Sequence, residues 1–367
     1  MNEKKLELLF ALQEHPIAPA AALAKQVKVS PPTTRAWLEG LRKEKVYVGV
    51  QANLRVRKLG LEIDDFLVSI DSYDALTKVE KFCRTHPYTS YRARVFGGTT
   101  HGVLLQFRQP DAARKHLVES LNIMKDKGLL TSIRELPTLT SDYGSTYTRP
   151  QRTAWDSEKM TWVFDWETWW NQAPSKVEKP KLVPESNEIF ELDTPDTKLL
   201  QELTLNARRK NIEIIQAMGM NPEQKGLQQL ISAKIKKLNT EVIESYRVFV
   251  NWTHFDVYNT PMIIAQAKSG VTRRLITHLS NSEFPFGSSI RETNDGFVWS
   301  ARLPSAHLSE LIALVWKISN SHELLIIDYK HSQNYGLWSE TFDTDTSTWK
   351  SDRKFCLETP MKSIGLM

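Results

Sequence analysis

At 367 residues the chain is longer than a single hydrophobic core usually serves, so the sequence predicts two or more domains. A net charge of +5 and a pI near 8.9 are only mildly basic, which excludes a protein that coats nucleic acid over its whole surface. Cys83 and Cys356 are the two cysteines, and their separation excludes a disulfide framework or a cysteine metal site. No signal peptide and no apolar run of about 18 residues is evident, so we expect a soluble, cytoplasmic protein without a membrane partner.

The first sixty residues carry the pattern of a winged helix-turn-helix. A short amphipathic helix is expected over residues 5–13 and an Ala/Leu-rich helix over residues 20–27. Ser30 then supplies an N-cap, and Pro31 and Pro32 stand where a helix can begin but could not continue. The residues of this third helix that are expected to pack inward repeat at helical spacing: Thr34, Leu38 and Leu41.

The outward face of the third helix suits the major groove of double-stranded DNA. Ala36 and Gly40 have almost no side chain, so the helix backbone can approach another surface closely. Lys and Arg outnumber acidic residues in this region and continue into the expected wing, which gives a local footprint for phosphates. Arg35 is a candidate for a guanine contact or a phosphate clamp, and the alternative for the whole helix is an ordinary hairpin with a solvated face. The predicted DNA contacts of this unit are Ser30, Thr33, Arg35, Ala36, Arg42, Lys43, Arg55, Arg57 and Lys58.

From residue 63 the hydrophobic period changes to strands that alternate with helices. The expected elements are a strand over 66–70, a helix over 75–84, strands over 91–95 and 103–107, a helix over 111–127 and a strand over 129–133. This βαββαβ order is that of a split, ferredoxin-like domain. The predicted fold class is therefore α+β.

The chain then repeats itself, so we predict two tandem copies of this unit. The matched stretches are residues 8–12 with 199–203, 66–70 with 262–266, 102–104 with 296–298, and 111–127 with 305–319. Because the matches keep one order through helices and strands, duplication is favoured over convergent amphipathic patterning. The predicted domains are a winged helix-turn-helix over 1–60, a ferredoxin-like domain over 61–140, a Trp-rich extension and linker over 141–191, a second winged helix-turn-helix over 192–257, a second ferredoxin-like domain over 258–333 and a C-terminal extension over 334–367.

The second copy opens on residues that resemble a known family. Residues 192–200, the triplets Asn206-Ala207-Arg208 and Met218-Gly219-Met220, and residues 235–238 are similar to the opening of the Lrp/AsnC feast/famine regulators of bacteria and archaea. The resemblance implies a tandem, archaeal-like member of that family, which acts as a sequence-specific transcription regulator.

In that family the sheet domain, known as the RAM domain, senses a ligand and forms dimers. A tandem chain would make this pseudo-dimer by itself, and homo-oligomers of the chain are expected. The resemblance places a small-molecule effector at the glycine turn, around Gly97, Gly98, Thr100 and His101. The acidic residue that the family has there is replaced, so the effector's identity stays open. The resemblance implies no catalytic residue, no cofactor and no enzyme activity.

The second copy carries a corresponding outward helix face. Its predicted core consists of Leu227, Leu230, Ile231, Ile235 and Leu238. Its predicted DNA contacts are Gln229, Ser232, Lys236 and Lys237. Gln229 has the amide that can pair bidentately with adenine. The longer turn over residues 221–226 leaves two alternatives, a unit that grips only phosphate and one kept for packing.

An aromatic cluster ends the first copy: Trp155, Trp162, Phe164, Trp166, Trp169 and Trp170. Its neighbours Asp156, Asp165 and Glu167 are acidic, which argues against nucleobase stacking. We expect the cluster to cover an exposed sheet or to form an interface between copies or chains. The nine His residues show no His-x-x-x-His or Cys/His spacing, so no metal site is predicted.

Two other functions are alternatives to a regulator. The two-module arrangement is also similar to haem-precursor (sirohaem-type) decarboxylases, which need histidines and an apolar porphyrin pocket in the sheet domain. His101 is the residue that suggests such a pocket here. The second alternative is a protein-interaction scaffold that has lost DNA binding, and for it the affinity for duplex DNA at low salt would be negligible.

Overall fold

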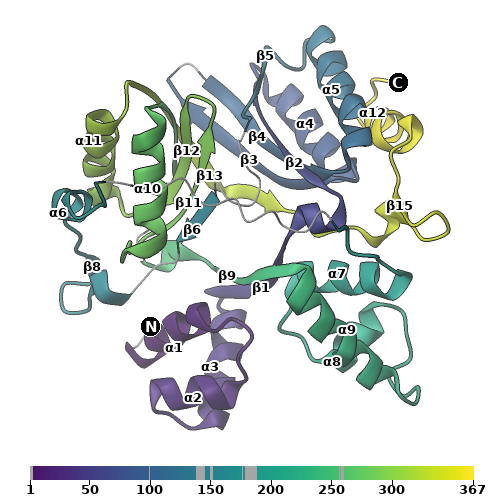
Figure 1. The fold of residues 1–367 in the computed structure, drawn as a ribbon, viewed down its shortest axis with the longest axis horizontal. Helices are drawn as coiled ribbons and strands as arrows, with labels where there is room; N and C mark the ends of the chain where they lie inside the picture. Colours follow the sequence, from purple (N-terminus) through teal and green to yellow (C-terminus); the bar gives the residue numbers. More distant parts are fainter. Residues whose placement is uncertain are drawn as a thin grey trace.

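The structure, a computed structural model, describes residues 3–98, 100–137, 145–148, 152–175, 177, 188–255, 257 and 260–367. It is a mixed α+β fold in which a large antiparallel sheet carries helices, with two smaller helical units side by side below it (Figure 1). A similar order of elements occurs twice along the described chain. We call the elements up to α6 the first half and those from α7 onward the second half.

Each half begins with three helices and a strand. The first half has α1 (Glu3–Glu14), α2 (Ala20–Val27), α3 (Pro31–Lys43) and β1 (Tyr47–Leu54), then the short helix η1 (Val56–Leu59). The second half has α7 (Thr194–Asn206), α8 (Asn211–Ala217), α9 (Leu227–Glu241) and β9 (Ile243–Val250), then the short helix η3 (Trp252–Phe255).

A sheet region and a tail follow in each half. The first half has β2 (Glu62–Ser69), α4 (Tyr73–Thr85), β3 (Thr89–Gly97), β4 (Thr100–Gln109), α5 (Asp111–Asp126) and β5 (Ser132–Glu135). Its tail has β6 (Ser145–Thr148), η2 (Arg152–Ala154), β7 (Trp155–Asp156), β8 (Thr161–Trp162) and α6 (Trp166–Asn171). The second half has β10 (Pro261–Gln266), α10 (Ser269–Asn281), β11 (Gly287–Thr293), β12 (Gly296–Arg302), η4 (Ser305–His307), α11 (Leu308–Ile318) and β13 (Ser321–Asn334). Its tail has η5 (Ser339–Thr341), β14 (Phe342–Asp343), β15 (Thr348–Trp349), η6 (Lys354–Glu358) and α12 (Thr359–Ser363).

Helix α3 forms as its sequence predicts. The Ser30 side chain accepts a hydrogen bond from the Thr33 backbone N–H at 3.2 Å, and prolines occupy the first turn, where no helical N–H is lost. Thr34, Leu38 and Leu41 are buried, which confirms the predicted inward face.

The predicted wing is wrong. Strand β1 does not fold back within the first half but pairs antiparallel with β9 of the second half. The helix η1 that follows β1 supplies no second strand, so the equivalent strand of the other half satisfies its backbone groups. Arg57 and Lys58 therefore lie on η1, and Arg55 donates a hydrogen bond from Nη1 to the Thr240 carbonyl at 2.9 Å.

Among the described residues, nine strands form one antiparallel sheet in the order β5-β2-β4-β3-β13-β10-β12-β11-β6. The halves join where β3 pairs with β13, whose 14 residues pair with β10 over the first part and with β3 over the second. Strand β6, which follows β5 in the chain, pairs with β11 at the far edge. Strands of the first half therefore flank the second half's strands on both sides.

The predicted match of residues 66–70 with 262–266 is wrong by one residue. Gly102 and Gly296 are matched between the halves. Leu104 lies two residues after Gly102, and Val298 lies two residues after Gly296. Leu67 lies opposite Leu104 and Ile264 lies opposite Val298, so Leu67 corresponds to Ile264. Side chains alternate between the two faces of a strand, and a slip of one residue exchanges the buried faces.

Each half packs helices on one face of its strands and meets the other half on the opposite face. Phe66 and Phe107 belong to the core under α4 and α5, and Ile263 and Trp299 to the core under α10 and α11. The inner faces of both halves share an apolar layer of Leu67, Ala93, Val95, Leu104, Leu136, Met262, Val298, Leu325 and Ile327. This inner layer holds the two halves together.

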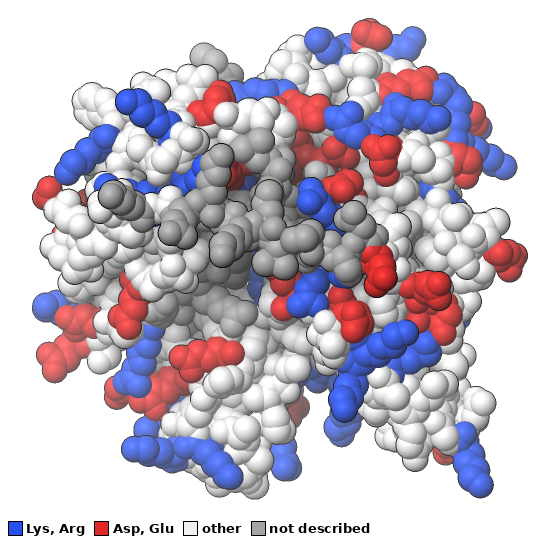
Figure 2. Space-filling view, in the orientation of Figure 1, with Lys and Arg blue, Asp and Glu red and all other residues white. Residues whose placement is uncertain are grey.

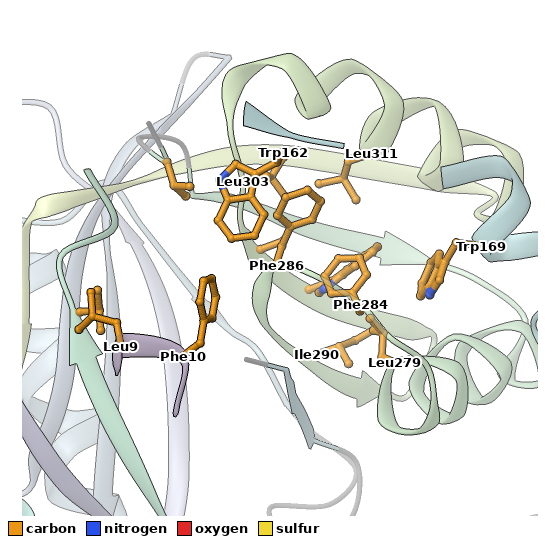
Figure 3. Close-up of a cluster of buried hydrophobic side chains, with 14 of the residues drawn as sticks. Leu9, Phe10, Trp162, Trp169, Leu279, Phe284, Phe286, Ile290, Leu303 and Leu311 are labelled. Atoms are coloured by element: carbon orange, nitrogen blue, oxygen red, sulfur yellow. The ribbon is translucent and has the colours of Figure 1, made fainter. Parts of the chain in front are cut away.

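The two tails are exchanged between the halves. Trp162 and Trp169 of the first half's tail lie against Phe286 and Phe284 of the second half, with ring centroids 5.9 and 5.2 Å apart (Figure 3). In return, Met361 of α12 is fully buried in the core under α4 and α5. Of the alternatives predicted for the tryptophan cluster, the structure shows a contact between the two halves.

Candidate functional site

A cavity of about 170 Å³ lies between the inner faces of the two halves, beside their shared apolar layer. Three arginines line it, Arg247 from β9, Arg291 from β11 and Arg302 from β12. The other polar residues that line it carry hydroxyl or amide groups: Tyr91, Gln106, Thr260, Ser288, Ser289, Ser300 and Asn334. We call this cavity the arginine chamber.

Strand alternation places the polar side chains of the chamber. On β11, Ser289 and Arg291 face the chamber, whereas Ile290 between them is buried in the core under α10 and α11. On β12, Ser300 and Arg302 face the chamber in the same way. Each strand thus presents a serine and an arginine two residues apart on its inner face.

The chamber carries an excess of positive charge. Arg291 forms an ion pair with Asp65 of β2, whose side chain is 2% exposed and whose Oδ1 accepts a hydrogen bond from Gln106 Nε2 at 2.9 Å. The Arg302 guanidinium lies 4.6 Å from the centre of the Tyr329 ring. The described lining residues include no Asp or Glu. Since guanidinium groups bind carboxylates and phosphates through paired N–H donors, the chamber is suited to an anion.

Tyr91 can supply a proton in the chamber. Burial raises the pKa of the Tyr91 phenol, while the charges of Arg302 and Arg247 act in the opposite direction. The net shift is upward, so the phenol is protonated at neutral pH and can donate a hydrogen bond or a proton.

The chamber lies where equivalent positions of the two halves meet. Tyr91 lies opposite Gln106 in the pair β3–β4, and Ser289 lies opposite Ser300 in the equivalent pair β11–β12. Gln106 lies four residues after Gly102, and Ser300 lies four residues after Gly296, so these two residues correspond. Their cross-strand partners, Tyr91 and Ser289, therefore correspond as well. A ligand would therefore meet a phenol and an amide from the first half, and hydroxyls and arginines from the second.

Solved structures similar to this fold include an enzyme over nearly the full length. The siroheme decarboxylase NirDL, in complex with an iron-uroporphyrin III analogue, matches with a TM-score of 0.55 at 10% identity, covering 92% of this chain and 95% of that chain. A second NirDL structure matches with a TM-score of 0.53 at 10% identity, covering 89% and 91%. The chain shares the fold of NirDL. A transcriptional regulator from Neisseria meningitidis in complex with L-Met matches over 39% of this chain and 92% of its own, with a TM-score of 0.33 at 21% identity.

These matches correct one prediction. The prediction that the chain is not an enzyme is contradicted, because the fold that covers 92% of it is that of an enzyme. Structures of Lrp/AsnC-type regulators, such as E. coli AsnC, are also similar, but only over 39% of this chain. No protein-family model matches the sequence, and no curated protein matches it.

The predicted DNA contacts of the first half fall in two places: Ser30, Thr33, Arg35, Ala36, Arg42 and Lys43 lie at α3 and its N-cap, and Arg55, Arg57 and Lys58 lie at η1, beyond β1. Helix α3 is in the lower helical unit of the first half (Figure 1). Six of these nine residues are exposed, and Thr33, Arg55 and Lys58 are half-buried; the exposed ones are Ser30, Arg35, Ala36, Arg42, Lys43 and Arg57. Lys43 pairs with the exposed Glu39 at 3.1 Å, and Arg57 pairs with Glu62 at 3.6 Å. Figure 2 shows Lys and Arg side chains at the lower edge of both helical units. DNA contact by these residues stays a prediction.

The predicted contacts of the second half are exposed on α9: Gln229, Ser232, Lys236 and Lys237. Ser232 Oγ accepts a hydrogen bond from Asn211 Nδ2 at 2.9 Å, and the Lys237 ammonium lies 4.6 Å from the centre of the Phe190 ring. Leu230, predicted to be core, is instead 48% exposed. The buried face of α9 is narrower than predicted and consists of Leu227, Ile231 and Leu238.

The structure does not gather the predicted effector residues around one cavity. A Cβ on Gly97 would lie 2.5 Å from the Leu324 carbonyl oxygen, and Gly98 has a φ of 55°, so backbone geometry accounts for both glycines. His101 borders an open cavity of about 360 Å³ that is separate from the arginine chamber. The side chain of Thr100 lies outside the described residues.

Sequence reasoning missed the arginines of the chamber. Arg291 and Arg302 each follow a serine by two residues, a spacing that many solvated strands also show. Their common site arises only when β11 and β12 face β3 and β4 across the inner layer.

Within the described ranges, no group of three or more His, Cys, Asp or Glu side chains is placed to hold a metal ion. No helix in that part of the chain is long and apolar enough to cross a bilayer. No histidine is among the described residues that line the arginine chamber.

Proposed function

We propose that the protein is a siroheme-decarboxylase-type enzyme that binds the carboxylate arms of a tetrapyrrole at the arginine chamber. The observation that carries the proposal is the convergence of Arg247, Arg291 and Arg302 on one cavity. A uroporphyrin-type macrocycle carries several carboxylates, which paired guanidinium donors recognise. The full-length fold shared with NirDL supports the proposal.

The size of the chamber limits how much of such a ligand it encloses. Its volume of about 170 Å³ is below the roughly 300–1,000 Å³ of pockets that enclose a whole drug-sized ligand. We therefore assign to the chamber one or two carboxylate arms, with the macrocycle at its mouth. The proposal assigns no protein ligand to the iron.

Decarboxylation of an acetate arm needs a proton and no external oxidant. The bond between the arm's methylene carbon and its carboxylate breaks, carbon dioxide leaves, and the electron pair stays on the methylene carbon. A proton then converts that carbon to a methyl group. Tyr91 is the assigned donor because its phenol lines the chamber and is protonated at neutral pH, and solvent reprotonates it. Arg291 and Arg302 are assigned to hold carboxylates that do not react.

The test is a titration of the protein with iron-uroporphyrin III and with siroheme, followed through the Soret band. We expect Arg302→Gln to weaken binding by about tenfold, since a hydrogen bond to a charged group contributes about 1.5–3 kcal/mol. Arg134→Gln is the matched control, because Arg134 is a half-exposed arginine paired with Glu323 at 2.6 Å outside the chamber. Mass spectrometry of bound siroheme should show loss of carbon dioxide, and this loss should slow in Tyr91→Phe. Absence of tetrapyrrole binding would refute the proposal.

DNA binding by α3 is the second candidate function. The observation that favours it is the exposed basic face of α3, where Arg35 and Arg42 flank the small residues Ala36 and Gly40. This candidate keeps the predicted domain bounds, with helix-turn-helix units over 1–60 and 192–257 and ferredoxin-like domains over 61–140 and 258–333. The strand of each helical unit pairs with that of the other unit and takes the place of a separate wing. The recurrent order of three helices and a strand, then βαββαβ, supports that division.

Binding to random duplex DNA at several salt concentrations tests this candidate. We expect Arg35→Ala combined with Lys43→Ala to weaken binding and to reduce the slope of log K against log salt by about 1 for each phosphate that is no longer neutralised. Lys81→Ala on α4 is the control, because Lys81 is exposed but lies on the sheet domain. An unchanged affinity and slope in the double variant would exclude α3 as the binding face.

A further inference from the structure

The ion pair between Asp65 and Arg291 joins the two halves at the wall of the chamber. Asp65 comes from β2 of the first half and Arg291 from β11 of the second. One Asp65 oxygen accepts from Arg291, and the other accepts from Gln106 at 2.9 Å. Both donors line the chamber, so the Asp65 carboxylate is a built-in anion held by the groups that a ligand would use.

The pair occurs on one side of the molecule only. Asp65 lies opposite Gln106 in the first half, and Met262 lies opposite the equivalent Ser300 in the second. Met262 is 1% exposed, so an apolar side chain fills that position in the other half. The fold therefore accommodates either a carboxylate or an apolar group at this place.

The position of Arg291 also carries a different kind of residue in the other half. Arg291 lies opposite Val298, and the corresponding residue opposite Leu104 in the first half is Ala93. Ala93 is fully buried in the shared apolar layer. Replacing a buried ion pair by apolar residues is often neutral or stabilising, so packing alone does not account for this pair.

We propose that Asp65 is a tethered competitor that sets the ligand specificity of the chamber. It occupies Arg291 until a ligand carboxylate displaces it. When a monocarboxylate binds, one carboxylate merely replaces another on Arg291, so the net free energy of binding is small. A ligand with several carboxylates binds Arg302 and Arg247 as well, and these contacts offset the displacement of Asp65. The proposal rests on the chamber being the ligand site, as in the proposed function, but not on the ligand being a tetrapyrrole.

The experiment is isothermal titration of the full-length protein with citrate, a tricarboxylate, and with acetate. We expect Asp65→Asn to lower the Kd for citrate about tenfold, because Arg291 then offers its donors without an internal competitor. Acetate should bind measurably to Asp65→Asn and not to the wild type. In Asp65→Asn combined with Arg291→Gln the gain in citrate affinity should disappear, which a general change in charge would not cause.

Asp64→Asn is the matched control. Asp64 is the neighbouring carboxylate on β2, pairs with Arg114 at 2.9 Å and accepts from Gln109 at 2.8 Å, and does not line the chamber. Its replacement removes a partly buried ion pair as well, so it should alter thermal stability without changing citrate affinity. Equal effects of Asp65→Asn and Asp64→Asn, or weaker citrate binding by Asp65→Asn, would overturn the proposal.

A crystal structure of the wild-type protein with citrate tests the proposal without any variant. We expect a citrate carboxylate on Arg291 and the Asp65 carboxylate turned away from it. An intact pair beside bound citrate, or no citrate binding to either protein, would overturn the proposal. The proposed function fails separately, if iron-uroporphyrin III does not bind while Asp65→Asn still tightens citrate binding.

Discussion

Replacing Trp166 with alanine tests whether the exchanged tail stabilises the second half. Trp166 is 4% exposed, and its ring stacks on Phe286 with centroids 5.9 Å apart and planes 18° apart. It also meets the edge of Phe284 at 5.7 Å and donates from Nε1 to His307 Nδ1 at 3.2 Å. Truncating a buried Trp to Ala costs about 3–5 kcal/mol. An unfolding entropy of about 2.1 cal/mol/K per residue means that each kcal/mol lowers the Tm of a 367-residue chain by about 1.3 °C. We therefore expect Tm to fall by about 4–7 °C.

Urea unfolding followed by circular dichroism measures this loss. Trp316→Ala is the control, because Trp316 is 76% exposed on α11 and its truncation should change stability by less than about 0.5 kcal/mol. A loss below about 1 kcal/mol for Trp166→Ala, or a loss equal to that of the control, would show that the tail contributes little to the second half.

Three further predictions concern the backbone, a buried carboxylate and the thiols. Gly296→Ala places a Cβ 1.9 Å from a backbone carbonyl of β10 and should cost about 1–3 kcal/mol in urea unfolding. Gly270→Ala, in open space on α10, should cost nothing. Burial acts to raise the pKa of Glu80, but hydrogen bonds and charges from two arginines of β3 bring it below its ordinary 4.5. Its stabilising contribution is therefore present above pH 4.5 and lost as the pH falls through the folded-state pKa, and Glu80→Gln should flatten the acid side of a stability-against-pH curve. Burial raises the pKa of Cys83 and of Cys356 to about 12, so neither thiol should react with a disulfide reagent at pH 8 until the protein is unfolded.

Features set within one helix could be predicted from the sequence. The inward face of α3 and its Ser30 cap depend on neighbours a turn away, and the structure confirms them. The wing could not be predicted, because β1 has the composition of a strand but its partner lies in the other half. The one-residue slip between β2 and β10 has a similar cause, since strand register is decided by pairing.

The candidate site was less accessible to sequence reasoning than the fold. Arg247, Arg291 and Arg302 lie on three strands of the second half, and Asp65 lies far away in the first. Nothing local distinguishes these side chains from the charged face of an exposed strand. Aromatic residues gave a stronger signal, because a run of tryptophans among acidic residues is costly to leave in water and so predicts an interface.

The exchange of tails has a consequence for how the two halves can evolve. Each half provides the cover for the other's aromatic or aliphatic core, so neither can be lost without exposing apolar surface. Because both belong to one polypeptide, they meet at an effective concentration that separate chains seldom reach, and always in a one-to-one ratio. A substitution that suits only one half can then persist, as with Arg291, whose equivalent position in the first half is Ala93, because it never meets a second copy of itself across the interface.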